Sequence, residues 1–527
     1  MEKISTSLST KSSESLHYAA NNGDIKEVKR LLRRYSYVDS LFGRNILLNE
    51  ANPKNGATAL WFASHKGHHK VVELLLAEEG VDVNKADKYG ATPLWQGARN
   101  GHKLVVEVLL GNAGIEVNKT NKSKFGCTPL YSAAHMGHER VVELLLRKNG
   151  IDVNQANENG FTALYAAAEN GHDKVVQLLL GKDGINVNYA RINGATPLIV
   201  AVFRGQNRVL ELLLNKTGIK VNLALITGET PLFVAAQNGD EKAVKLLLGT
   251  EGINLNHARS NGTTPLIVAA FKGHNRVVER LLNKPGIQEN LAMITGETPL
   301  YMAARNGHEI VVKLLLGKEG INVNAGISYG VTPLIAASFK GQHRVVELLL
   351  SKPGIQVNLA LITGETPLFM ASLTGHEEVV QLLLAKEGIN VNLERNSGAT
   401  PLLIAAFKGH HRVVDLLLNT TGIQVNLAMV NGITPLHTAA QNGHEDVVKS
   451  LLKKDGTQVN PQDWEGGTPL SGAAEKRHGR IVEMLLRKED ILATGWNGWR
   501  PHRRPPYLSR QPDIRYGVGH RGKMKKI

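Results

Sequence analysis

The chain has 527 residues, of which 42% are hydrophobic and only 5% aromatic, so a packed core must consist mainly of aliphatic side chains. Its single cysteine, Cys127, excludes an internal disulfide and a multi-cysteine zinc site, and it favours a reducing compartment. The formal net charge is +15, but residues 498–527 hold nine Lys and Arg against one Asp, so the rest of the chain is only mildly basic and its charge is no evidence for a body that binds nucleic acid.

The N-terminal segment, residues 1–13, is polar and rich in Ser and Thr, and we predict that it is disordered. It contains no apolar signal segment, and no run of about 18 apolar residues occurs in the chain. We therefore expect neither secretion through such a signal nor insertion into a membrane.

Residues 14–52 contain a predicted helix pair, LHYAANNGDIKEVKRLL, that would cap the structure that follows. The Gly between these helices, Gly23, lies 44 residues before its counterpart Gly67, whereas later counterparts are mostly 34 apart. The extra residues fall within SYVDSLFGRNILLNEANPKNG, which predicts an enlarged exposed turn, here called a finger. The basic cluster from Lys26 to Arg34 is typical of the polar outer face of a cap, although it would also suit an acidic partner.

Thirteen repeats follow in residues 53–487, each marked by the pattern Gly-x-Thr-(Pro or Ala)-Leu. Successive patterns are 34 residues apart, except for one step of 36 where residues 122–124 lengthen a loop. Such a regular period indicates one continuous stack of small modules instead of several globular domains. The glycines of the pattern are Gly56, Gly90, Gly126, Gly160, Gly194, Gly228, Gly262, Gly296, Gly330, Gly364, Gly398, Gly432 and Gly466.

Each position of the repeat has a local role. The Gly permits a tight turn because it tolerates a positive φ, the Thr hydroxyl caps a helix, and the Pro occupies the first helical position. An Ala-rich helix then ends at a second Gly. A second helix, VVELLL in several repeats, carries apolar residues at helical spacing and is expected to end at the Gly before Ile. Val-Asn then leads extended chain to the next turn, and neighbouring repeats must shield each other's apolar sides.

Gly-x-Thr-Pro-Leu, the Ala-Ala pair, Gly-His, Val-Val-x-Leu-Leu-Leu and the closing Val-Asn together resemble ankyrin repeats. The resemblance implies an all-α repeat fold, a curved ankyrin-repeat α-solenoid with β-hairpin fingers. It also implies partner binding by repeats that have no catalytic residues and no cofactor. Two features depart from the family pattern: the period is 34 instead of the commoner 33, and the His that usually follows Thr-Pro-Leu occurs only once, as His437.

The repeats alternate between two types, most clearly from 194 to 465, so that similar sequence recurs every 68 residues. Type A resembles TPLIVAAFKGHNRVVE, and type B resembles TPLFVAAQNGDEKAVK. Family geometry places the end of the first helix and the finger on the concave side, where type A presents a Phe with a cation and type B an apolar finger residue. The predicted partner-binding residues are Phe203, Arg204, Ile226, Phe271, Lys272, Ile294, Phe339, Lys340, Ile362, Phe407, Lys408 and Val430.

An extended or helical partner segment with apolar and acidic groups would suit this surface. Glu229, Glu297 and Glu365, which follow the finger glycines of type B, are expected beside it. The alternative is that all these residues recur only because a gene segment was duplicated, and that they pack between fingers.

A second alternating pattern lies at the start of the second helix, where type A has Arg and type B has Glu. Because neighbouring repeats bring these opposite charges together, we predict a ladder of exposed, individually weak ion pairs that supports stability. The arginines are Arg208, Arg276, Arg344 and Arg412, and the glutamates are Glu241, Glu309, Glu377 and Glu445.

Residues 488–527 begin with a degenerate repeat start, TGWNGWRPH, in which Arg500 replaces the Thr. A basic segment with several prolines follows, and we predict that it is a disordered tail. The tail, residues 500–527, would suit a nuclear import signal or a weak contact with nucleic acid, and we expect no nucleic-acid binding elsewhere.

Searches for catalytic and metal-binding patterns give only isolated matches. Nine His residues follow the Gly between their two helices; this position is structural in the ankyrin family, and one His per repeat makes no coordination shell, so we predict no metal site. Gly517–Gly522 has the spacing of a dinucleotide fingerprint but follows no strand and opens no helix. Cys127 is expected to be incidental, and Ser36, after two arginines, is a weak phosphorylation motif.

These features predict a non-catalytic protein–protein interaction scaffold or adaptor, monomeric and located in the cytoplasm, the nucleus or both. We expect no catalytic domain, because the segments outside the repeats are short. Two alternatives stay open. One is a nuclear regulatory protein, such as a transcription coregulator that acts by binding proteins, and the other is a microbial effector that targets host proteins.

Overall fold

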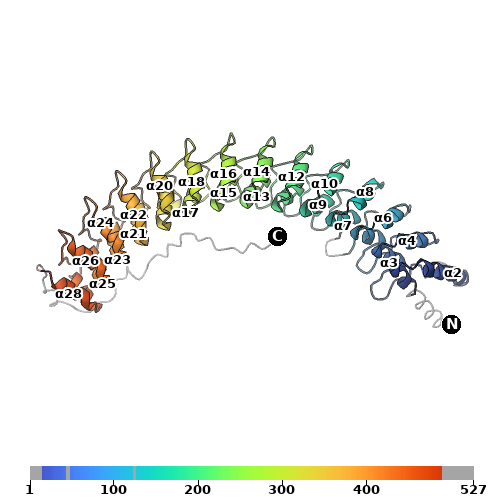
Figure 1. Ribbon diagram of the computed structural model, residues 1–527, viewed down its shortest axis with the longest axis horizontal. Coiled ribbons are helices and arrows are strands. Elements are labelled where there is room, and N and C mark those ends of the chain that lie inside the picture. The colour runs from blue at the N-terminus through green and yellow to red at the C-terminus, as the bar shows by residue number, and fades with distance from the viewer. Residues whose placement is uncertain (1–14, 43–47, 123–125, 489–527) are drawn as a thin grey trace. The chain divides into compact units, whose positions relative to one another are not determined.

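A computed structural model of the chain describes residues 15–42, 48–122 and 126–488 (Figure 1). The predicted disordered N-terminus and the predicted basic tail lie outside these residues. The chain divides into two compact units. Unit 1 is Met1–Pro333 with Ser351–Ile355, and unit 2 is Leu334–Leu350 with Gln356–Ile527.

Unit 1 begins with a helix over residues 15–22 and the longer helix α2 (Ile25–Phe42), and continues with pairs of short helices. These are α3 (Ala59–Lys66), α4 (His69–Leu76), α5 (Pro93–Arg99), α6 (Lys103–Leu110), α7 (Pro129–Met136), α8 (Glu139–Arg147), α9 (Ala163–Asn170), α10 (Asp173–Leu180), α11 (Pro197–Phe203), α12 (Asn207–Leu214), α13 (Pro231–Asn238), α14 (Glu241–Leu248), α15 (Pro265–Lys272), α16 (Asn275–Leu282), α17 (Pro299–Asn306) and α18 (Glu309–Leu316), followed by the 3-10 turn η1 (Ser328–Gly330).

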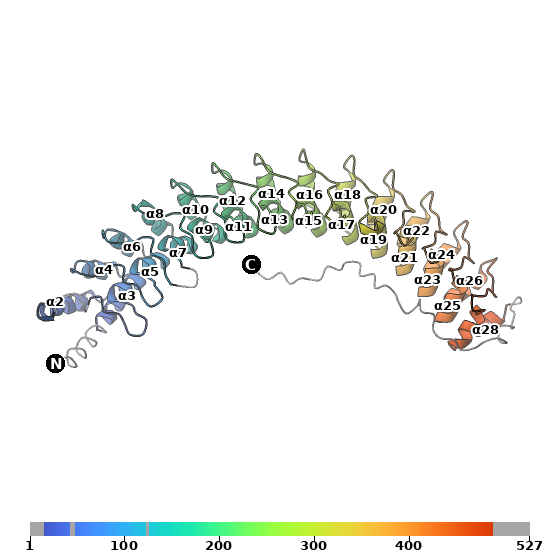
Figure 2. The ribbon, with the colours of Figure 1, turned by 180° about the vertical axis from the view of Figure 1, so that it is seen from behind.

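Unit 2 is built from the same kind of pair. Its helices are α19 (Pro333–Lys340), α20 (His343–Leu350), α21 (Pro367–Thr374), α22 (Glu377–Leu384), α23 (Pro401–Lys408), α24 (His411–Leu418), α25 (Pro435–Asn442), α26 (Glu445–Lys453), α27 (Pro469–Glu475) and α28 (Gly479–Leu486). Within each unit the first helices of successive pairs lie side by side, and the second helices form another row alongside them (Figures 1 and 2).

The first helix of a repeat starts and stops as its sequence predicts, and α17 is a representative case. The Tyr301 backbone N–H donates to the hydroxyl of the capping residue Thr298 over 3.1 Å, and Pro299 occupies the first turn. Gly307 ends the helix in the left-handed region at φ 75°, which a residue without a Cβ adopts at little cost. Similar caps recur at Thr residues of both units.

The core is aliphatic, as the composition requires. In α18, Val311, Val312 and Leu315 are fully buried, and the Ala pair of α17, Ala303 and Ala304, is also fully buried. Small alanines on the first helix let the neighbouring helices approach closely. Each repeat therefore buries its apolar sides mainly against the repeats before and after it.

The chain after the second helix differs from the prediction in two ways. Helix α18 ends at Leu316, whereas Gly320, the Gly before Ile, lies in a separate turn at φ 79°, so this Gly does not close the helix. Val323 and Asn324 then form a turn instead of extended chain. A turn is required because the chain must reverse within a few residues to reach the next first helix.

The Asn of Val-Asn ties one repeat to the next through both atoms of its amide. The Asn222 Nδ2 group donates to the Gly252 carbonyl oxygen over 2.8 Å, and the Asn254 backbone N–H donates to Asn222 Oδ1 over 2.9 Å. Equivalent pairs of bonds recur at Asn154 and Asn392. This amide clamp holds the loop after the following second helix in place.

The expected β-hairpin fingers are not supported, because no β-strand occurs in the described part of the chain. The finger before α13 is a tight turn in which the Leu225 N–H donates to the Glu229 carbonyl over 3.0 Å. One further backbone bond, from the Ile226 N–H to the Asn193 carbonyl over 3.1 Å, links it to the preceding finger. A strand needs a run of consecutive ladder bonds, which so short a contact does not supply.

The enlarged finger predicted after the first helix pair is also partly wrong. Helix α2 continues to Phe42, so residues 36–42 extend the second helix of the pair. The middle of the predicted finger, residues 43–47, lies outside the described residues. The extra chain length is therefore used at least in part for helix, where each residue gains a backbone hydrogen bond.

Candidate functional site

Four first helices of type A end in a Phe followed by a cation, and in each case the cation lies over the ring of its neighbour. Such cation–π contacts are favourable within about 6 Å of the ring centroid. The distances from cation to ring centroid are 5.7 Å for Arg204 over Phe203, 5.7 Å for Lys272 over Phe271, 5.6 Å for Lys340 over Phe339 and 5.3 Å for Lys408 over Phe407. We call these four sets the Phe–cation pairs. Each presents an apolar ring together with a positive charge.

The four pairs differ in how far their charge is neutralised by the protein itself. The Arg204 guanidinium forms an ion pair of 2.7 Å with Glu169 of the preceding repeat. Among the residues that the structure describes, no acidic side chain pairs with Lys272, Lys340 or Lys408. These three lysines therefore keep a free positive charge beside a partly exposed Phe.

The apolar finger residues of type B point into solvent. Ile226 and Ile294 in unit 1 are each 79% exposed, and Ile362 and Val430 in unit 2 are 66% and 60% exposed. The residue before Ile362, Leu361, is buried instead. Successive residues of the turn thus face opposite ways, one into the protein and one outward. We call the outward residues the finger tips.

Two further finger tips were not predicted, because the prediction compared only the fingers of type B repeats. Ile192 and Trp464 are 76% and 75% exposed, and each lies two residues before its turn glycine, at the same position as Ile226. Position relative to that glycine, rather than similarity to the type B sequence, would have found them. The finger tips form one set in unit 1 and another in unit 2, which packing between fingers does not explain because most of their surface is accessible.

The finger glutamates are less available than the sequence suggested. Glu365 is only 4% exposed; it forms an ion pair of 3.4 Å with Arg395 of the next repeat and accepts a hydrogen bond from the Thr363 hydroxyl. Glu229 pairs with Arg259 over 3.2 Å in the same way. These two carboxylates join neighbouring fingers, which leaves Glu297 as the finger glutamate that pairs with no arginine among the described residues.

The histidines after the inter-helix Gly connect repeats. His308 Nε2 donates to the carbonyl oxygen of Phe271, 37 residues earlier, over 2.9 Å, and a Cβ added at Gly273 would lie only 2.6 Å from the His308 ring. Further His–carbonyl bonds of this kind are made by His68, His102, His138, His172, His274, His376, His410, His444 and His478. Within the described ranges, no group of three or more His, Cys, Asp or Glu side chains is placed to hold a metal ion.

The predicted ladder of ion pairs is only partly formed. Arg276 pairs with Glu241 over 3.4 Å and Arg412 with Glu377 over 3.3 Å, in each case with the preceding repeat. Arg208 and Arg344 instead pair with glutamates one turn later in their own helices, at 2.9 and 3.2 Å. The carboxylate 35 residues before Arg208 belongs to Asp173, whose side chain is one methylene shorter than that of Glu241.

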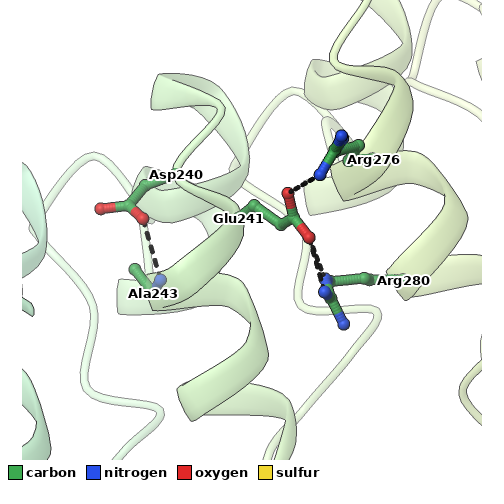
Figure 3. Close-up of polar contacts among 5 residues, drawn as sticks. All are labelled: Asp240, Glu241, Ala243, Arg276 and Arg280. Atoms are coloured by element: carbon green, nitrogen blue, oxygen red, sulfur yellow. Dashed lines mark hydrogen bonds and ion pairs between the residues drawn. The ribbon is translucent and has the colours of Figure 1, made fainter.

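Glu241 has two arginine partners, which the sequence pattern did not reveal (Figure 3). Arg280 donates to the same carboxylate as Arg276, with 2.5 Å between Nη2 and Oε1. The hydrogen bond from Arg280 holds the pKa of the Glu241 carboxyl below its usual value. Asp240, the preceding residue, accepts a hydrogen bond from the Ala243 N–H and caps α14. This cluster fastens α14 to α16.

The position after Thr-Pro-Leu carries an inter-repeat link in two different chemical forms. His437 Nε2 donates to the Gly467 carbonyl over 3.1 Å, and its Nδ1 accepts a hydrogen bond from the backbone N–H of the cap residue Thr434. At the same position in the first repeat, Trp61 donates its indole N–H to the Ala91 carbonyl over 3.0 Å. In the first repeat, where no His follows the Leu, Trp61 therefore supplies an inter-repeat link.

The remaining sequence motifs gain no chemistry from the structure. Cys127 is partly buried, and its sulfur lies 3.9 Å from the side-chain amide of Asn157. The Gly517–Gly522 segment lies outside the described residues. In the part of the chain that the structure covers, every helix is too short or too polar to cross a bilayer.

Comparison with known proteins gives one family. The family model described as Ankyrin repeats (3 copies) matches overlapping segments that together cover the chain from 16 to 494. The matched residues are 16–121, 106–191, 155–225, 198–293, 285–360, 357–429 and 422–494. No curated protein matches the chain.

Proposed function

The chain belongs to the ankyrin-repeat family, and from this premise we propose that it is a non-catalytic scaffold or adaptor that binds partner proteins through its finger tips and Phe–cation pairs. Ankyrin repeats generally serve as protein–protein interaction modules. The observation that carries the proposal is the recurrence of finger tips that are 60% to 79% exposed. A single exposed apolar side chain is ordinary on a protein surface, but the same exposed position is apolar in six repeats, and this recurrence supports a surface that another molecule covers.

The chemistry of this surface indicates the chemistry of its partner. The apolar finger tips favour apolar side chains, and Lys272, Lys340 and Lys408 favour carboxylates placed beside the phenylalanine rings. Two of the three finger glutamates, Glu229 and Glu365, offset these lysines little because they are already paired with arginines, whereas Glu297 accepts a hydrogen bond from the Thr295 hydroxyl. A partner segment that carries both apolar and acidic residues would fit best.

The spacing of equivalent residues limits how the partner segment is arranged. Ile226 and Ile294 are two repeats apart, and stacked helices lie about 8–10 Å apart, so equivalent groups lie roughly 20 Å apart. An extended segment spans that distance in about six residues and a helix in about thirteen. We therefore expect apolar anchors in the partner at one of these two intervals.

Affinity capture by the full chain, followed by mass spectrometry, would test the proposal. The variant carries Phe271→Ala, Ile294→Ala and Phe339→Ala together, and the matched control carries Leu104→Ala at an exposed site on the second helix α6. We expect the triple variant, but not the control, to lose most captured partners. If both variants retained every partner of the unaltered chain, these residues would not form the binding surface.

The basic segment 500–527 favours a second candidate, a nuclear regulatory protein that acts by protein binding. The segment lies outside the described residues, so its support comes from sequence only. Imaging a tagged chain with and without residues 500–527 separates the two possibilities. Nuclear signal that depends on the segment supports the nuclear candidate, and identical cytoplasmic signal for both chains removes it.

A further inference from the structure

The row of second helices in unit 1 holds an apolar groove that is separate from the finger tips. It lies between α16 and α18, has a volume of about 340 Å³, and is lined by Leu282, Leu314 and Ile310 among others. This volume is at the small end of ligand sites in proteins, which run from roughly 300 to 1,000 Å³, and it suits one or two side chains.

Ile310 departs from the residues at the same place in the other type B repeats. It is 55% exposed, and its equivalents are Lys242, Glu378 and Asp446. A charged side chain at this position is solvated in three copies, whereas the fourth exposes an isoleucine beside a groove. Stability does not require an apolar residue here, since the copies pack the same helices without one.

A second departure from the copied sequence occurs on the opposite side of α16. Arg280 replaces the Leu212, Leu348 and Leu416 of the other type A repeats. Its guanidinium is held by Glu241 on α14 (Figure 3). Helix α16 is thus fastened by charge on its α14 side, while its α18 side borders the open groove.

The charges around the groove are asymmetric. Lys313 and Lys318 lie on the α18 side, and Glu279 lies on the α16 side. We propose that this groove is a second binding site, for a short segment of a partner protein that inserts one or two large apolar side chains against Ile310, Leu282 and Leu314. A carboxylate of the segment meets the two lysines of the α18 side. The chain would then carry two separate binding surfaces, which goes beyond the function proposed above and allows it to bridge two partners.

Fluorescence anisotropy with the full chain and labelled hexapeptides tests this site. The probe is Asp-Asp-Leu-Phe-Asp-Asp, with Lys-Lys-Leu-Phe-Lys-Lys and Asp-Asp-Ala-Ala-Asp-Asp as controls. We expect saturable binding of the probe only. Ile310→Lys should weaken it at least tenfold, and this variant should fold normally because Lys242 occupies the same place in a copy; thermal unfolding followed by circular dichroism checks that it does.

Leu104→Lys is the matched control, because Leu104 holds the same position on α6 as Ile310 on α18 and is also exposed. The two lysines are missing there, since Glu107 and Asn112 occupy the positions of Lys313 and Lys318. This control should leave binding unchanged. The double variant K313E/K318E should transfer the preference to the lysine peptide. The absence of saturable binding, or equal effects of Ile310→Lys and Leu104→Lys, would overturn the proposal. Loss of binding with Ile294→Lys but not Ile310→Lys would also overturn it, since the finger tips would then bind the probe.

Discussion

The imidazole Nε2 of His308 donates a hydrogen bond to the backbone carbonyl oxygen of Phe271, with 2.9 Å between the two atoms. The same bond joins His376 to Phe339 and His444 to Phe407. The residue that ties one repeat to the next thus also holds the helix end that presents a Phe–cation pair. Stability and the proposed binding surface are therefore linked through one contact.

Replacing His308 by Ala should lower the free energy of unfolding by about 1 kcal/mol, because one inter-repeat hydrogen bond is lost. His308→Gln should cost less, since Gln206 occupies this place in another repeat. Urea denaturation followed by circular dichroism measures both changes. Equal stability of the Ala variant and the unaltered chain would show that the bond contributes nothing. Reduced partner capture by the Ala variant would show the link to Phe271.

The amide clamp at Asn222 can be divided into its two halves. Asn222→Ala removes the donor to Gly252 and the acceptor for Asn254, and we expect a loss of about 1 kcal/mol in unfolding free energy, because both groups are exposed and water replaces part of each bond. Asn222→Asp keeps only the acceptor, and should lie between the Ala variant and the unaltered chain. Thermal unfolding under identical buffer conditions ranks the three proteins. Any other order contradicts the clamp.

The carboxyl of Glu241 should titrate below its ordinary value of 4.5 because Arg280 donates to its ionised form. The folded pKa is lowered, so this contribution to stability is present at neutral pH and is lost as pH falls below 4.5 through the folded value. NMR titration of the Glu241 carboxyl in the Arg280→Leu variant, which restores the residue of the sibling repeats, should show the pKa raised. An unchanged pKa would mean that Arg280 does not stabilise the carboxylate.

His437 provides a pH effect near neutrality. Desolvation by burial lowers its pKa from the ordinary 6.5, so the folded chain favours the neutral ring. The unfolded chain binds the proton first as pH falls below 6.5, and stability should decline over that range down to the lowered folded value. Two other repeats have Phe at the position of His437, as Phe233 and Phe369. The variant His437→Phe should therefore remove this part of the pH dependence. Parallel stability curves for both proteins between about pH 5 and pH 8, a range that includes the ordinary pKa of His, would contradict the effect.

Much of each repeat could be predicted from the sequence because the forces that shape it act over a few residues. Thr298 caps the helix that follows it, Pro299 fits the first turn, and Gly307 adopts the left-handed conformation that ends it. Val311, Val312 and Leu315 are buried because helical spacing puts them on one side of α18. None of these outcomes depends on the type of the neighbouring repeat.

The tertiary structure decided the contacts that depend on whether a side chain is long enough to reach the neighbouring repeat. Whether Arg208 pairs with a neighbouring repeat or with its own helix, and whether Glu365 faces the open surface or is buried against Arg395, follows from side-chain lengths and distances that a repeating pattern does not specify. The turn that replaces the expected hairpin, the helical extension of α2 and the groove beside Ile310 are of the same kind. The sequence by itself determined the module, because backbone conformation and capping are local. Only packing in three dimensions determined which side chains are used between modules and which stay exposed to solvent.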